Sequence, residues 1–226
     1  METPLDFKPM DIEQARFNMI EQQIRTWEVL DQDVLDLLFV IKRERFAPEK
    51  WRALAFADME IPLGHSQAMW PPKLEARCLQ EISLKKTDTV LEVGTGSGYL
   101  TALLAARAQH VYSVEIIPEL AKRVAETLKT EGVTNITLNT GDASRGWNKN
   151  APYDVIVLTG SVPLLLEVYQ QALKPEGRLF AIVGDPPVMA AKLITCAAPG
   201  AYSSVDLFET CVAPLVNAPQ PERFIF

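Results

Sequence analysis

The sequence predicts an α/β protein built on a doubly wound, mainly parallel β-sheet. From residue 88 onward, short apolar stretches with strand character alternate with helical stretches, as in repeated βαβ units. A glycine-rich turn, 94–98, follows the first of these apolar stretches and leads into the first helix. The last two strand candidates have no helix between them, so we expect them to pair antiparallel near one edge of the sheet.

The periodicity of apolar residues sets the expected bounds of these elements. Strands are expected at 88–93, 110–115, 135–139, 153–159, 177–183, 189–197 and 202–214. Helices are expected at 99–107, 118–130 and 162–173. Pro118 opens the second of these helices, which suits proline because an N–H at that position would have no partner within the helix.

The first 84 residues have a different pattern. Residues 10–40 show helical spacing of apolar residues, and Asp31 is a plausible cap for a helix at 32–41. The charged run 42–48 is expected to be a solvated turn. Residues 61–72, rich in proline and apolar side chains, should form an ordered loop that caps the core or covers a ligand, and 73–84 should be helical.

The composition is that of a globular protein with a sizeable core. The chain has 226 residues, of which 48% are hydrophobic and 23% charged, and its net charge is −7. This acidic balance argues against a nucleic-acid partner, and two histidines make a histidine-rich metal site improbable. Cys78, Cys196 and Cys211 are too scattered for a disulfide framework, so buried, reduced thiols are expected. With no apolar leader and no bilayer-length apolar run, we expect no membrane partner and a cytoplasmic protein.

Residues 90–99 read VLEVGTGSGY, an apolar strand that ends in a turn with three alternating glycines. Glycine lets the backbone turn sharply and lets a ligand approach the backbone N–H groups. Tyr99 stands where a dinucleotide fingerprint needs its last glycine, and the lysine of a P-loop is absent. Thr95 and Tyr99 also replace the two glycines of a G-x-S-x-G hydrolase turn. The pattern that remains is acidic-x-G-x-G-x-G.

Three acidic residues stand at the ends of successive expected strands. A carboxylate at Glu92 would repel a pyrophosphate, but it suits a ligand that carries an ammonium and a sulfonium, directly or through water. Glu115 ends the next strand, where a carboxylate can accept both ribose hydroxyls. Asp142 follows the third strand, where its side chain and a backbone amide can read an adenine edge. Each acid alone fits a turn or cap, but together they predict S-adenosylmethionine as the cofactor.

In the order of its motifs over residues 15–216, the chain resembles the protein-L-isoaspartate O-methyltransferase family. The segments that carry the resemblance are 23–25, 34–35, 43–48, 61–64 with Gln67, 91–99, 141–142, 151–154, 173–179 and 212–215. Members of that family transfer a methyl group from S-adenosylmethionine to the α-carboxylate of an isoaspartyl residue, which starts repair of a damaged protein. The resemblance implies a Rossmann-like class I methyltransferase fold, and S-adenosylhomocysteine as the product of the cofactor.

The three acids and the resemblance together assign the candidate site. The cofactor candidates are Glu92, Gly94, Thr95, Gly96, Ser97 and Gly98 at the methionine end, Glu115 at the ribose, and Asp142 with Ala143 at the adenine. The substrate-loop candidates are His65, Ser66, Gln67 and Trp70. No residue is assigned a catalytic role, and no metal is expected.

The substrate loop departs from the family pattern. The family continues with Gln-Thr-Ile-Ser, whose hydroxyls contact the substrate carboxylate or lie near the methyl group, whereas this chain has Gln67, Ala68, Met69 and Trp70. A large indole therefore replaces the serine. Ser66, or the N–H of Trp70, could offer a substitute donor. We expect methyl transfer to an isoaspartyl peptide to be weak or absent, with Trp70 acting as a change of specificity or as a plug.

Three functions stay open from the sequence. The first is isoaspartyl methylation, with a protein or peptide substrate as the partner. The second is methylation of another carboxylate or a small molecule, and the third is non-catalytic binding of S-adenosylmethionine by a protein that acts through a partner. We expect one domain, 1–226, in which 1–84 supply the N-terminal helices and substrate loop and 85–226 form the cofactor-binding core. The oligomeric state is not predicted.

Overall fold

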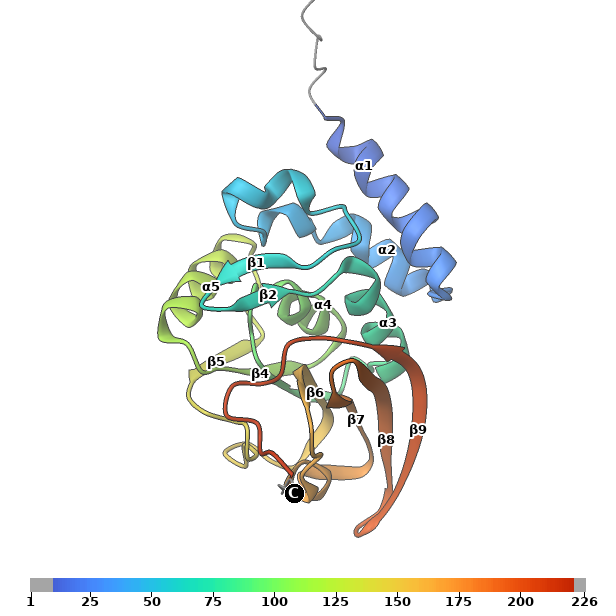
Figure 1. Cartoon of the computed structure of the whole chain (residues 1–226), viewed down its shortest axis with the longest axis vertical. Coiled ribbons are helices and arrows are strands. Elements are labelled where there is room, and N and C mark those ends of the chain that lie inside the picture. The colour runs from blue at the N-terminus through green and yellow to red at the C-terminus, as the bar shows by residue number, and fades with distance from the viewer. Residues whose placement is uncertain (1–9, 222–226) are drawn as a thin grey trace, which may run out of the picture.

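The computed structural model describes residues 10–221, which are built around a seven-stranded sheet in the order β5-β4-β3-β6-β7-β8-β9 (Figure 1). Its strands are β3 (Thr89–Val93), β4 (His110–Glu115), β5 (Ile136–Thr140), β6 (Tyr153–Val162), β7 (Leu173–Asp185), β8 (Val188–Ala198) and β9 (Ala201–Thr210). Strands β3 to β7 pair in parallel, and β8 and β9 pair antiparallel at one edge. The expected α/β fold class is confirmed, including the antiparallel end of the sheet.

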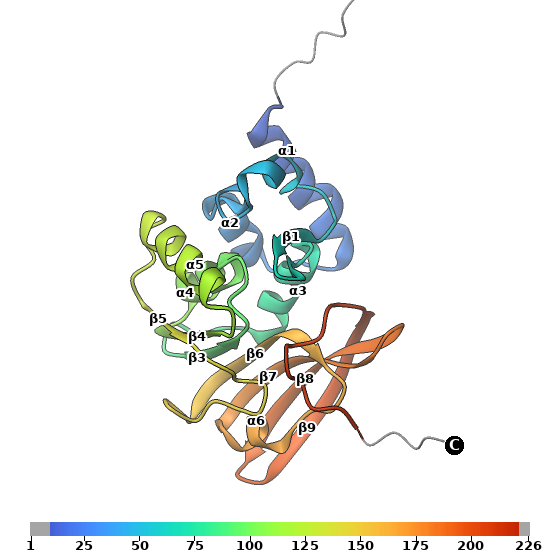
Figure 2. The same cartoon turned by 60° about the vertical axis from the view of Figure 1, so that its left-hand side comes forward.

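Helices cover both faces of this sheet (Figure 2). They are α3 (Pro72–Ile82), α4 (Tyr99–Arg107), α5 (Pro118–Thr130) and α6 (Glu167–Gln171). Successive side chains of a strand point to opposite faces of the sheet, so each strand contributes to two buried clusters. Val155 and Val157 of β6 belong to the cluster under α3, α4 and α5, whereas Ile156 and Leu158 belong to the cluster under α6. Apolar residues on both faces explain why these strands read as continuous apolar runs.

The N-terminal region is helical, as predicted, with an interruption. It contains α1 (Ile12–Asn18), a π-helical turn (Met19–Ile24), a 3₁₀ turn (Arg25–Trp27) and α2 (Gln32–Val40). Glu28 adopts a left-handed conformation, with a φ of 61°, and ends the first helical stretch. The Asp31 carboxylate accepts the backbone N–H groups of Asp33 at 2.9 Å and Val34 at 3.3 Å, which confirms it as the cap of α2.

The prediction that residues 42–48 form a solvated turn is wrong. Arg43 is 1% exposed and Glu44 is 8% exposed within a short 3₁₀ helix, Arg43–Arg45. Arg43 pairs with Glu75 of α3, and its Nη2 donates to the Trp70 carbonyl at 2.6 Å. Buried charges are tolerated only when paired and hydrogen-bonded, and a charge run in sequence does not show whether its partners lie far along the chain.

Residues 61–72 are an ordered segment as expected, but a β-hairpin rather than a loop. Strand β1 (Ile61–Gly64) pairs antiparallel with β2 (Gln67–Met69). His65 and Ser66 form the turn with φ values of 53° and 58°. A turn of two residues with positive φ has a twist that matches that of the paired strands. His and Ser are not a sequence signal for such a turn, whereas Asn-Gly would be.

The helix predicted at 162–173 is mostly absent. Strand β6 continues to Val162, and only Glu167–Gln171 are helical. The C-terminal segment holds the strand extended, because the Ser161 N–H donates to the Ala213 carbonyl at 3.0 Å and the Leu215 N–H donates to the Ser161 carbonyl at 2.9 Å. This long-range pairing overrides the helical spacing of the leucines.

The cysteines agree with the expectation in part. Cys78 and Cys196 are buried and all three thiols are free, but Cys211 is exposed just after the edge strand β9. No helix within residues 10–221 is both long and apolar enough to cross a membrane.

The buried pair of Arg43 and Glu75 generates a prediction about stability. Arg43→Ala should lower the free energy of unfolding by about 3–5 kcal/mol, because it leaves the Glu75 carboxylate buried without its partner. Urea denaturation followed by circular dichroism measures the change. The matched control is Arg45→Ala. The exposed guanidinium of Arg45 lies 3.3 Å from Glu131, so its removal should lower the free energy of unfolding by no more than about 1 kcal/mol. An equal loss of unfolding free energy in the two variants would contradict a stabilising role for the buried pair of Arg43 and Glu75.

Candidate active site

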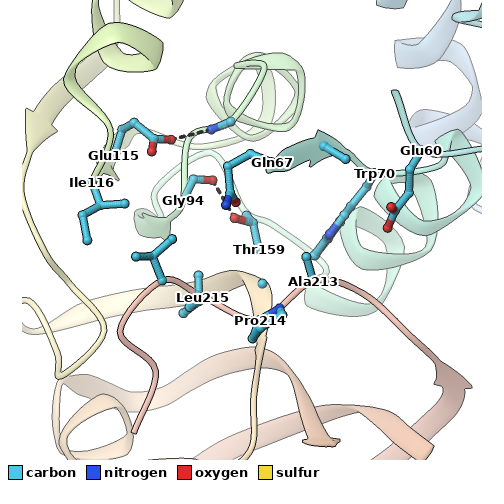
Figure 3. A pocket seen from close by; sticks show the side chains of 14 residues that line it. Glu60, Gln67, Trp70, Gly94, Glu115, Ile116, Thr159, Ala213, Pro214 and Leu215 are labelled. Atoms are coloured by element: carbon cyan, nitrogen blue, oxygen red, sulfur yellow. Dashed lines mark hydrogen bonds between the residues drawn. The ribbon is translucent and has the colours of Figure 1, made fainter. Parts of the chain in front are cut away.

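A trench runs past the carboxyl ends of β3, β4 and β6, the edge at which parallel sheets bind ligands (Figure 3). The central hollow encloses about 570 Å³, its open mouth included, and is lined by Glu60, Gln67, Ala68, Trp70, Gly94, Gly96, Glu115, Ile116, Thr159, Gly160 and residues 213–216. The inner hollow is lined by Ala68, Met69, Trp70, Glu75, Glu92, residues 94–97, Leu100 and Thr159. The side hollow is lined by Val93, Gly94, Val114, Ile116, residues 141–144, Leu215 and Val216. Gly94 lines all three, so the hollows lie next to one another around the turn that follows β3.

The glycine turn is held by its own backbone hydrogen bonds. The N–H groups of Gly94 and Gly98 donate to the carbonyls of Val114 and Thr95 at 2.8 and 2.9 Å, and the N–H of Gly96 donates to the Glu115 carboxylate at 2.9 Å. The three glycine amides are therefore not free to cradle a phosphate, contrary to the general expectation for such a turn. This arrangement agrees with the exclusion of dinucleotide and P-loop patterns.

Gly94 and Gly160 permit a close approach of three segments beneath the trench. A Cβ on Gly94, which has a φ of 96°, would collide with the Thr159 hydroxyl. Thr159 in turn donates to the carbonyls of Val93 and Gly94, at 2.9 and 2.6 Å. A Cβ on Gly160 would lie 2.8 Å from the Leu215 backbone nitrogen. The floor of the trench therefore requires glycine at both positions.

Glu92 is fully buried at the base of the inner hollow. Its Oε2 accepts the hydroxyls of Thr101 and Ser113, both at 2.6 Å, and Thr95 in turn lies 2.6 Å from Ser113. Its Oε1 is sealed from solvent and has no hydrogen-bond partner. Burial raises the pKa of Glu92 to about 7, against the hydrogen bonds from Ser113 and Thr101 that lower it.

Glu115 ends β4 and ties the glycine turn to the next segment. Its Oε2 accepts the Gly96 N–H at 2.9 Å, and its Oε1 accepts the Ile117 N–H at 3.0 Å. A carboxylate has about four lone-pair positions, so each oxygen keeps capacity for a further donor from the central hollow.

Asp142 lies at the far end of the side hollow, after β5. It accepts the Ser144 N–H at 2.9 Å and the Asn217 side-chain amide at 2.9 Å. Although burial alone would raise the pKa of Asp142, the hydrogen bonds from Ser144 and Asn217 keep it below its usual value. Ala143 is buried beside it, and its carbonyl accepts the Tyr169 hydroxyl at 2.6 Å.

Of the four substrate-loop candidates, two line the trench and two do not. Trp70 and Gln67 line the central hollow, and Trp70 also lines the inner hollow. His65 and Ser66 are exposed at the hairpin turn and line none of the three hollows, so the structure does not bring them together with Gln67 and Trp70. His65 and Ser66 both lie in the tight turn itself, outside the paired residues of the hairpin, whereas Gln67 begins β2 and Trp70 follows it.

Several lining residues were missed by sequence reasoning. Thr159 and Gly160 follow the apolar part of β6, and the rule that ligands lie at carboxyl ends of strands could have found them. Residues 213–216 and Asn217 reach the trench because the chain returns to pair with Ser161, a contact that no local pattern encodes. Glu60, just before β1, carried no distinguishing signal.

The doubly wound sheet with its antiparallel edge has the class I methyltransferase fold. The family model described as "Protein-L-isoaspartate(D-aspartate) O-methyltransferase (PCMT)" matches residues 14–218. The chain belongs to this family, and S-adenosylmethionine is its cofactor.

Relatives and solved structures agree with the family. A protein-L-isoaspartate O-methyltransferase of Gloeobacter violaceus is 34% identical over 205 residues, which cover 91% of this chain and 100% of that protein. One from Myxococcus xanthus is 41% identical over 69% of this chain and 74% of its own length. A beta-aspartate methyltransferase structure from Plasmodium falciparum, in complex with S-adenosyl-L-homocysteine, superposes with a TM-score of 0.78 at 18% identity, covering 92% of this chain and 99% of that one. This last likeness shows the shared fold.

The burial of Glu92 predicts a pH dependence of stability. An unfolded glutamate titrates near 4.5, whereas the pKa of Glu92 in the folded protein is about 7. Between these values only the unfolded state is ionised, so this group's stabilising contribution is full below pH 4.5 and is lost as the pH rises to about 7. In Glu92→Gln this part of the slope should vanish, as measured by urea denaturation at a series of pH values from 4.5 to 8.

The matched control is Glu119→Gln, at an exposed position in the first turn of α5, which should leave the slope unchanged. A stability difference between the wild type and Glu92→Gln that stays constant from pH 4.5 to 8 would contradict the raised pKa.

Proposed function

We propose that the protein transfers a methyl group from S-adenosylmethionine to the carboxylate of an isoaspartyl residue in a damaged protein. The observation that carries the proposal is the joining of two parts in one space. Trp70 and Ala68 of the hairpin segment line both the central and the inner hollow, beside Gly94 and Gly96 of the turn after β3. A cofactor on the turn and an acceptor under the hairpin would therefore meet, and family membership supports the nature of both.

The trench suggests how the cofactor lies. Asp142 and Ala143 would hold the adenine in the side hollow, and Glu115 would accept the ribose hydroxyls in the central hollow. The methionine end would reach the inner hollow, which residues 94–97 of the turn and Glu92 line. Burying a carboxylate oxygen without a partner is unfavourable, and a cationic group nearby would lower this free-energy cost.

The chemistry asks little of the protein beyond orientation. An isoaspartyl carboxylate is ionised at neutral pH, so the nucleophile needs no general base. The residues that line the three hollows include no lysine, arginine or histidine. Holding the carboxylate oxygen in line with the methyl group at near-attack distance is therefore the main task.

The N-terminal helices would form one domain with the sheet, in keeping with the single domain expected from the sequence. Met19, Ile24 and Leu35 belong to the same buried cluster as Leu103 of α4 and Phe180 of β7. We also propose a cytoplasmic location, which accords with three free thiols and which cell fractionation would test.

Binding of S-adenosylhomocysteine tests the cofactor residues. It should raise the melting temperature, and Glu115→Ala should weaken binding about tenfold or more, because charge-assisted hydrogen bonds to the ribose are lost. Isothermal calorimetry and a thermal shift measure both effects. Glu119→Ala on exposed α5 is the control and should bind as the wild type does. Unchanged binding in Glu115→Ala would remove Glu115 from the site.

Methyl transfer tests the acceptor. The protein should methylate a short peptide with one isoaspartyl residue and leave the peptide with ordinary aspartate unmodified, as followed with labelled S-adenosylmethionine. Cofactor binding without any transfer to, or binding of, the isoaspartyl peptide would refute the proposed acceptor.

A further inference from the structure

Trp70 lines both the central and the inner hollow. It is 7% exposed, and its ring lies 6.4 Å from the Phe180 ring in an edge-to-face arrangement. Its carbonyl is held by Arg43 at 2.6 Å, so the backbone of the residue is fixed as well. Figure 3 shows its ring reaching from the hairpin toward Ala213 and Pro214, across the central hollow.

The indole N–H of Trp70 is free to donate. Within residues 10–221 no hydrogen-bond partner for this nitrogen is found, and it is not among the polar atoms that are sealed from solvent without a partner. The nitrogens of Trp51 and Trp147, by contrast, are sealed in this way. An unpaired donor on a side chain that is nine-tenths buried, in a wall of the central hollow, is placed for a ligand.

The charge of the central hollow makes such a donor important. Two acids, Glu60 and Glu115, line it, and none of its lining residues is cationic. Burial raises the pKa of Glu60, which has no described ion-pair partner. A carboxylate acceptor therefore meets repulsion and needs neutral N–H or O–H groups to hold it.

Two other hydroxyls near the acceptor end are engaged or displaced. The Thr159 hydroxyl donates to backbone carbonyls, and Ser66 is exposed at the hairpin turn. The Gln67 amide makes one long contact of 3.5 Å with the His65 carbonyl and could assist. Trp70 is thus a rigid donor that lines both the central and the inner hollow.

We propose that the indole N–H of Trp70 donates a hydrogen bond to the acceptor carboxylate and positions its oxygen for methyl transfer. Trp70 is then an acceptor-binding residue and not a plug. This inference rests on the proposed function, and it specifies how this chain binds its substrate.

The test removes the N–H and keeps the ring. Trp70→Phe should raise KM for the isoaspartyl peptide, or its Kd with the S-adenosylhomocysteine complex, about tenfold or more. Binding of S-adenosylhomocysteine itself should stay unchanged. Trp51→Phe makes the same change at an indole outside the trench and should leave all these values at those of the wild type.

A second measurement does not depend on a folded variant. In a ¹⁵N-labelled protein with its four tryptophans, one indole N–H resonance should shift downfield when the isoaspartyl peptide joins the S-adenosylhomocysteine complex. That resonance should be absent from Trp70→Phe and present in Trp51→Phe.

The outcomes separate the two proposals. If the wild type neither binds nor methylates the isoaspartyl peptide, the proposed function fails, and this inference fails with it. If the wild type binds it and Trp70→Phe binds equally well, with no indole shift, only the role of Trp70 is overturned. Faster turnover by both Trp70→Phe and Trp70→Ser would show that the ring obstructs the acceptor, which also overturns the role.

Discussion

The guanidinium of Arg43 joins the two halves of the site. It donates from Nε to the Ala55 carbonyl at 2.8 Å and from Nη2 to the Trp70 carbonyl at 2.6 Å, and it pairs with Glu75 of α3. It also lies over the ring of Tyr99, 5.2 Å from its centroid, at the first residue of the helix that follows the glycine turn. One buried cation therefore holds the hairpin against the helix that follows the glycine turn. Burial lowers the pKa of Arg43 to about 10, so it stays charged at neutral pH.

The carboxylates that line the trench differ in their partners and in their burial. Arg43 pairs with Glu75, and two backbone amides donate hydrogen bonds to Glu115. Burial leaves Glu92 near its titration point at neutral pH. Glu60 stands at the wall with no described partner. The positive sulfonium and ammonium of S-adenosylmethionine suit such a space, because a positive charge lowers the repulsion between these carboxylates.

Local pattern predicts the cofactor half better than the acceptor half. Helices α4 and α5 and strand β4 have the bounds expected from periodicity, and acids at strand ends mark the trench because parallel strands deliver their carboxyl ends to one edge. The hairpin turn at His65 and Ser66, the buried state of Arg43 and the extended Ser161 each depend on contacts far along the chain. A charge run or a leucine-rich stretch looks the same whether or not such a partner exists. For that reason the sequence suggested both Ser66 and Trp70 as donors, and only the fold separates them.

The most direct test is a crystal structure of the complex with S-adenosylhomocysteine and an isoaspartyl peptide. We expect the cofactor sulfur beside Gly94, the ribose on Glu115, and an acceptor carboxylate oxygen within hydrogen-bond distance of Trp70 Nε1. An acceptor carboxylate bound away from Trp70, or the indole ring lying between the sulfur and the acceptor, would contradict this expectation.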